Sequence, residues 1–174
     1  MNVLDLFSGI GGFSLGLERA GMETVAFCEF EPHAQKILAK HWPNIPIHDD
    51  VRTLDGKQYR GSIDVICGGF PCQDISIAGK NNGGINGERS GLWQEYKRLI
   101  KEIQPKYAII ENVSALLSRG LDVVLSDLAE IGYDATWTVI DTKYTGRPQR
   151  RRGSDPSEGA QRPFPLTLVE ILPS

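Results

Sequence analysis

Short apolar runs alternate along this chain with stretches in which apolar residues recur at helical spacing. Runs of about four to eight apolar residues are typical of buried strands, and recurrence every three or four positions is typical of amphipathic helices. Because strand and helix signals alternate from the N-terminus onward, the pattern predicts βαβ units that build a mostly parallel sheet. We therefore expect an α/β fold.

The predicted strands cover residues 2–7, 23–28, 63–67, 107–110 and 135–140. The predicted helices cover residues 13–20, 32–40, 90–103 and 121–131. Gly, Ser, Pro and Asp dominate residues 153–163, which predicts a loop, and only 166–172 regain an apolar pattern. We expect one domain over 1–152, followed by an irregular segment over 153–174.

The length of 174 residues fits one domain with its own core. The net charge of −3 does not mark a nucleic-acid binder, and the basic residues concentrated in 143–152 read, on composition alone, as a solvated run. Three cysteines without a CxxC spacing argue against a metal site and a disulfide framework and indicate a reducing, cytoplasmic compartment. No apolar run is long enough to span a membrane, and the N-terminus lacks the pattern of a signal peptide.

A glycine-rich turn follows the first predicted strand, in the sequence Asp5-Leu6-Phe7-Ser8-Gly9-Ile10-Gly11-Gly12. Glycines let the backbone approach a ligand closely, and a helix N-terminus offers unpaired amides. Glu29 ends the second strand, where an acidic side chain binds ribose hydroxyls in many nucleotide sites. These residues predict a nucleotide-like cofactor site; a tight turn without ligand and a surface glutamate are the alternatives.

Two further candidates follow later strands. Cys72 comes after Gly68-Gly69-Phe70-Pro71 and before polar residues, where a thiol can be exposed and activated, whereas Cys28 and Cys67 are expected to be buried. Glu111 and Asn112 end an apolar strand, and a carboxylate there can protonate a heterocycle or cap the next turn. Because sites form at the carboxyl ends of parallel strands, all these candidates should share one edge.

The same residues resemble the cytosine-C5 DNA methyltransferase family, in family order from Asp5 to Arg152. The matching motifs are DLFSGIGG, CEFEPHA, GGFPCQDIS, ENV and GRPQRRR. The resemblance implies the three-layer Rossmann-like fold of S-adenosylmethionine-dependent methyltransferases, with S-adenosylhomocysteine as the product. It also implies double-stranded DNA as substrate and a cytoplasmic, prokaryotic or phage-encoded protein of restriction-modification type.

Motif matching implies roles for individual residues. Cys72 would attack C6 of a flipped cytosine, and Glu111, Asn112 and Arg151 would hold and polarise the base. The residues implied to bind the cofactor are Phe7, Ser8, Gly9, Ile10, Gly11, Gly12, Glu29, Phe30, Asp50, Val51, Pro71 and Leu92. The residues implied to contact DNA are Gln73, Ser76, Gln149, Arg150 and Arg152, which changes the interpretation of the basic cluster to phosphate and base contacts.

The sequence departs from the family pattern after Arg152. Gly153 stands where the motif has a further arginine, and residues 153–157 cannot form the apolar strand that should follow. The target-recognition region and the closing motifs have no counterpart, so a deletion near Arg152–Gly153 or a complementing chain that brings recognition is expected. The alternatives to a DNA methyltransferase are a non-catalytic module that binds S-adenosylmethionine and, with less support, a tRNA methyltransferase.

Overall fold

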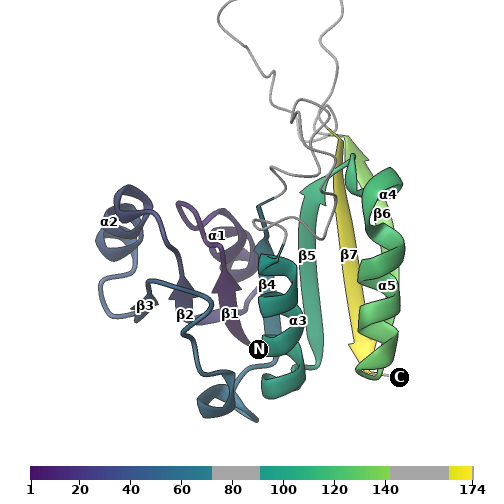
Figure 1. The fold of residues 1–174 in the computed structure, drawn as a ribbon. Helices are drawn as coiled ribbons and strands as arrows, with labels where there is room; N and C mark the ends of the chain where they lie inside the picture. The colour runs from purple at the N-terminus through teal and green to yellow at the C-terminus, as the bar shows by residue number, and fades with distance from the viewer. Residues whose placement is uncertain (72–90, 142–164, 174) are drawn as a thin grey trace, which may run out of the picture.

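The structure is a computed structural model that describes residues 1–71, 91–141 and 165–173. Within these ranges, seven strands form one sheet in the order β3-β2-β1-β4-β5-β7-β6 (Figure 1). The strands are β1 (Asn2–Leu6), β2 (Glu23–Cys28), β3 (Ile47–His48), β4 (Val65–Gly69), β5 (Tyr107–Val113), β6 (Tyr133–Asp141) and β7 (Pro165–Pro173). The helices are α1 (Gly12–Arg19), α2 (Pro32–His41), the 3₁₀ helix η1 (Gly56–Tyr59), α3 (Leu92–Ile103), α4 (Leu116–Arg119) and α5 (Leu121–Glu130).

Parallel pairing joins β3, β2, β1, β4 and β5, so the carboxyl ends of these strands share one edge of the sheet. The predicted α/β fold with a mostly parallel sheet is confirmed. The predicted helices and strands are found with small shifts at their ends, for example β4 at Val65–Gly69 instead of 63–67. Sequence patterning missed β3, η1 and α4, which are two, four and four residues long.

The C-terminal segment corrects one expectation. Residues 153–174 were expected to be irregular and to lack the apolar strand that should follow Arg152; of these, 153–164 lie outside the described residues. Instead β7 inserts between β5 and β6 and pairs antiparallel with both, Ile171 with Ala108 and with Ala135. The apolar pattern over 166–172 therefore forms the missing strand, because an open edge of β5 offers it a full ladder of backbone partners.

The main core lies between the sheet and helices α3 and α5, which cover one of its faces (Figure 1). Trp93, Tyr96 and Leu99 of α3 are fully buried there against strand residues such as Ile66 and Ile110. A smaller cluster of Val3, Val65 and Cys67 lies on the opposite face. Phe13 and Leu17 of α1 pack against this second cluster, so helices cover both faces of the central strands.

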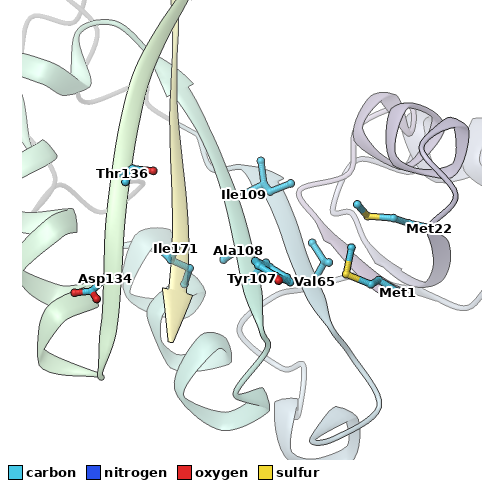
Figure 2. A pocket seen from close by; sticks show the side chains of 9 residues that line it. All are labelled: Met1, Met22, Val65, Tyr107, Ala108, Ile109, Asp134, Thr136 and Ile171. Atoms are coloured by element: carbon cyan, nitrogen blue, oxygen red, sulfur yellow. The ribbon is translucent and has the colours of Figure 1, made fainter. Parts of the chain in front are cut away.

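The second face is open beyond α1. A groove of about 270 Å³ lies there, and its lining includes Met1, Met22, Tyr107 and Ile109 together with Thr136 of β6 (Figure 2). Tyr107 is 39% exposed, which is high for an aromatic side chain on a sheet face. In the described part of the chain, no helix combines the length and apolar character that crossing a bilayer requires.

Candidate functional site

The predicted site residues of the described segments gather at the carboxyl edge of the sheet. Phe7 follows β1, Glu29 follows β2, Pro71 comes two residues after β4, and Glu111 lies near the end of β5. Neighbouring parallel strands bring these positions together although they are far apart in sequence. The edge thus combines the glycine-rich turn, an acidic side chain and the segment that leads into Cys72.

The turn between β1 and α1 has an unusual backbone. Phe7, Gly9 and Gly11 all have positive φ, at 52°, 53° and 86°. Ser8 fixes the turn from inside, since its hydroxyl donates to the Asp5 carbonyl at 2.6 Å and its backbone N–H donates to the Cys28 carbonyl at 3.2 Å. The turn therefore has one defined shape, and its backbone faces the edge where a ligand could approach.

Glu29 is anchored to this turn. Its Oε2 accepts the Gly9 backbone N–H at 2.7 Å, and its Oε1 accepts the Glu31 N–H at 2.7 Å. A carboxylate has about four lone-pair sites, so each oxygen can still accept one further hydrogen bond. Glu29 is therefore oriented by the backbone and retains the acceptors that a ribose diol needs.

Large apolar side chains are exposed beside this carboxylate. Phe30 is 71% exposed and Ile10 is 64% exposed. Apart from the adjoining backbone, no heavy atom of the described residues lies within 4 Å of where a Cβ at Gly9 or Gly12 would stand, so there is space along the turn. Exposed apolar surface next to oriented acceptors suits a ligand with an aromatic base and a hydroxylated sugar.

Asp50 and Val51 follow β3. Both Asp50 oxygens accept hydrogen bonds from Arg52, which lowers the pKa of the Asp50 carboxyl. Val51 is buried at 5% exposure, and its carbonyl accepts a hydrogen bond from Arg98 of α3 at 2.9 Å. Arg98 also donates to the Leu54 carbonyl at 3.1 Å, so α3 fixes the segment that carries both predicted residues.

Buried aromatic rings of α3 support the site from the core side. Phe7 stacks on Tyr96 with ring centroids 6.2 Å apart, and Phe70 lies 5.6 Å from Trp93. Leu92 and Phe7 are partly buried against the same core cluster that contains Val51 and Phe70. Predicted cofactor residues from three separate sequence segments, Phe7, Val51 and Leu92, thus belong to or pack against one core cluster.

Glu111 lies beside the end of β4. Its carboxylate stands so close to Gly69 that a Cβ at that position would overlap Oε2, and burial raises the pKa of Glu111. The Asn112 amide donates to the Phe70 carbonyl at 3.2 Å and is 2% exposed. The strand end carrying Glu111 is therefore tied to the segment that leads into Cys72.

The two described cysteines are buried, as expected. Burial raises the pKa of Cys28 to about 12 and that of Cys67 well above its ordinary value, so neither thiol ionises near neutral pH. The other predicted catalytic and DNA-contacting residues lie outside the described residues: Cys72, Gln73, Ser76, Gln149, Arg150, Arg151 and Arg152. Within the described ranges, no group of three or more His, Cys, Asp or Glu residues could hold a metal ion.

Sequence patterning missed two residues that shape the site. Asp5 is fully buried beneath the glycine-rich turn, and Arg98 braces the segment after β3. A single acidic residue inside the apolar run Val3–Phe7 was the available signal for Asp5, because a buried carboxylate needs a structural or functional reason. Arg98 gave no signal, since its contacts join segments more than 40 residues apart.

Comparison with known proteins gives one family. The sequence model of the family described as C-5 cytosine-specific DNA methylase matches residues 1–152. The type II methyltransferase M.Eco47II of Escherichia coli is 42% identical over 184 aligned positions, which cover 98% of this chain and 44% of that protein. The type II methyltransferase M2.BsuMI of Bacillus subtilis is 39% identical over 159 positions, covering 87% of this chain and 40% of the relative.

Solved structures share the fold. The Dnmt2 methyltransferase of S. pombe superposes with a TM-score of 0.72 at 18% identity, over 99% of this chain and 49% of that one. At that identity the structural similarity supports a shared fold and no shared activity. The chain spans less than half of the length of each of these relatives.

Proposed function

The chain belongs to the C-5 cytosine-specific DNA methylase family, and on that premise we propose that it transfers a methyl group from S-adenosylmethionine to C5 of cytosine in double-stranded DNA. One observation carries the proposal: the Glu111 carboxylate lies against Gly69, three residues before Cys72, at the edge that also holds the Gly9–Glu29 pair. Because the chain spans less than half of the length of these relatives, the activity of the complete enzyme is part of the proposal.

The glycine-rich turn and its surroundings fit S-adenosylmethionine. Glu29 would accept the ribose hydroxyls, and Phe7, Ile10 and Phe30 would supply apolar surface around the adenosine. Two further groups of residues would complete the pocket. The amino-acid portion of the cofactor would lie along Ser8, Gly9, Gly11 and Gly12. The adenine would be surrounded by Asp50, Val51, Pro71 and Leu92. When bound, the cofactor supplies an electrophilic methyl group.

Cys72 would act as the nucleophile. Cytosine C5 is a weak nucleophile, and addition of the Cys72 thiolate to C6 converts the ring into an enamine whose C5 can take the methyl group. A base then removes the C5 proton, and the C6–S bond breaks to release the thiolate. Cys72 follows Phe70 by two residues in the sequence.

Glu111 would hold the base during this addition. Burial raises its pKa, which favours a protonated carboxyl that can donate a hydrogen bond to N3 of cytosine. Negative charge that builds on the ring as the thiolate adds would be stabilised by this donor. Asn112 and Arg151 would position the base and its O2 atom.

Double-stranded DNA is the proposed partner. A cytosine inside a duplex hides C6 from a thiol, so the base must leave the stack before Cys72 can reach it. Gln73, Ser76, Gln149, Arg150 and Arg152 would contact the DNA around the flipped base, the arginines mainly through phosphates. A complementing chain could supply target recognition.

A methyl-transfer assay tests the proposal. The chain is incubated with S-adenosylmethionine carrying a labelled methyl group and long DNA of mixed sequence, and the DNA is digested to nucleosides. We expect label in 5-methylcytosine with the wild type and none with Cys72→Ser, while both bind the cofactor. Label in another nucleoside, or transfer to tRNA but not to DNA, would contradict the proposal.

A further inference from the structure

Asp5 is a fully buried carboxylate that none of the proposed catalytic or binding roles uses. It lies in β1, at 0% exposure, on the face that α1 covers. Its Oδ2 accepts the Ser14 hydroxyl at 2.7 Å and the Ser14 backbone N–H at 3.3 Å. Among the described residues, Oδ1 has no partner with good hydrogen-bond geometry, and the weakly polar Cys67 thiol is the group that faces the carboxylate from β4. An unpaired buried carboxylate oxygen costs free energy, so its retention calls for a reason.

Asp5 caps α1 from the neighbouring strand. The first backbone N–H groups of a helix have no partner within the helix, and a side chain at the N-cap position usually satisfies one of them. Here the N-cap is Gly11, which has no side chain, and Ser14 is the third residue of α1. The carboxylate of Asp5 replaces the missing cap and also favours the positive end of the helix dipole.

The cap spans the glycine-rich turn. Asp5 precedes the turn in sequence and Ser14 follows it, so the Asp5–Ser14 bonds close residues 6–13 into a loop that is tied at its base. Phe7 is held there at φ 52°, in a left-handed conformation that a non-glycine residue adopts only when its surroundings enforce it. The same turn also contains Gly9, whose backbone N–H donates to the Glu29 carboxylate.

We propose that Asp5 and Ser14 are positioning residues of the cofactor site. They do not contact S-adenosylmethionine themselves; by capping α1 beneath the turn, they hold residues 7–12 in the conformation that binds it. The inference rests on the proposed function, which supplies the ligand. It predicts that cofactor affinity depends on a buried group outside the pocket.

The ionisation of Asp5 should change the strength of its hydrogen bonds to Ser14 and therefore the affinity for the cofactor. The groups that face Asp5 are Ser14 from α1, Cys67 from β4 and, farther away, Glu29 after β2 and Tyr96 from α3. None of these is a cation, and burial raises the pKa of Asp5 to about 7. An ionised carboxylate accepts more strongly from the two Ser14 donors than a neutral one, so cofactor affinity should rise as the pH rises through 7.

The test measures S-adenosylmethionine binding by titration calorimetry between pH 6 and pH 8. At pH 8 we expect Ser14→Ala to bind about tenfold more weakly, the effect of one charge-assisted hydrogen bond. We expect Asp5→Asn, which keeps the size of the side chain, to lose the pH dependence that the wild type shows. A matched control is Thr24→Val, which removes another buried polar atom that has no partner among the described residues and should bind as the wild type does. Thr24 pairs with Val3 near the start of β1, whereas the turn follows the end of β1.

The outcomes separate the two claims. If the wild type binds the cofactor but Asp5→Asn and Ser14→Ala retain its affinity and pH profile, the positioning role is overturned and the proposed function stands. If Thr24→Val weakens binding as much as Ser14→Ala, the effect is general destabilisation and the positioning role is again overturned. If the folded wild type does not bind S-adenosylmethionine at all, the proposed function itself fails.

Discussion

At the scale of single residues, two adjacent glycines at the end of β4 meet different neighbours. A Cβ at Gly68 would overlap the backbone carbonyl of Leu6, which belongs to the neighbouring strand and cannot move away. A Cβ at Gly69 would instead overlap the carboxylate end of Glu111, a flexible side chain. The first glycine is therefore required by the fold, and the second by the position of the proposed catalytic glutamate.

Gly69→Ala should separate activity from stability. The added methyl group displaces the Glu111 carboxylate, so we expect methyl transfer to fall by about a hundredfold to a thousandfold, as when a single transition-state hydrogen bond is lost. The free energy of unfolding should change by only about 1 kcal/mol, because the flexible side chain can move. Methyl transfer and urea unfolding measured on the same preparation check this.

Gly68→Ala provides the opposite control. Its clash is with backbone, so the variant should unfold at much lower urea concentration and lose activity only as far as it loses structure. Unchanged methyl transfer in folded Gly69→Ala would contradict the role given to Glu111.

Asp5 also predicts a pH dependence of stability. Its pKa is raised from 3.8 to about 7 in the folded protein, so the folded state binds this proton more tightly than the unfolded chain does. The contribution is complete below about pH 4 and is lost as the pH rises toward 7, at up to about 1.4 kcal/mol per pH unit. Urea unfolding at pH 5 and pH 8 should therefore show Asp5→Asn gaining stability relative to the wild type at the higher pH. An equal difference at both pH values would argue against a titrating Asp5.

Some of these residues could be identified from sequence and others could not. Phe7, Glu29 and Glu111 follow apolar runs directly, and parallel strands bring such positions to one edge, so their proximity was predictable. The partners of Asp5 were not, because the 2.7 Å contact with Ser14 depends on how α1 packs against β1. The roles of Asp50 and Arg151 stay predictions.

At the scale of elements, β7 determines whether the sheet is complete. It is the only described strand that pairs antiparallel on both sides, joining β5 to β6. The long apolar runs of β1 and β5 made these strands predictable, whereas β3, with two residues, gives no periodic signal. The place of β7 could not be predicted from 166–172 alone, because strand order depends on which edge is left without a partner.

Val169→Pro tests the place of β7. Val169 pairs with Ile110 on one side and Trp137 on the other, and proline removes a backbone N–H in the interior of the sheet. We expect the free energy of unfolding to fall by more than the ~1 kcal/mol of one hydrogen bond, since both ladders are disturbed. Val169→Thr keeps the N–H and the β-branched shape and should be close to the wild type. Equal stability of both variants in thermal unfolding would show that β7 does not occupy this place.

At the scale of the whole molecule, the two faces of the sheet differ. The face under α3 and α5 is closed by large buried side chains, while the groove on the other face leaves Tyr107 39% exposed (Figure 2). Exposed apolar patches on a folded surface bind apolar molecules readily. The molecule should therefore bind an apolar fluorescent dye while folded.

Tyr107→Lys should reduce this dye fluorescence by about half, because it introduces a charge into the groove. Leu117→Lys is the matched control, since Leu117 is also 39% exposed but does not line the groove, and it should leave the fluorescence unchanged. Equal losses in both variants would show that the dye does not report on the groove.

The covalent adduct between the chain and cytosine tests the central claim most directly. A fluorine at C5 cannot leave as a proton does, so a duplex that carries 5-fluorocytosine should stop the reaction after methyl transfer, with the enzyme still bound to C6. Incubation with this DNA and S-adenosylmethionine, followed by mass spectrometry of the digested adduct, should place the bond on Cys72. No adduct should form with Cys72→Ser. An adduct on another residue, or none with the folded wild type, would contradict the account.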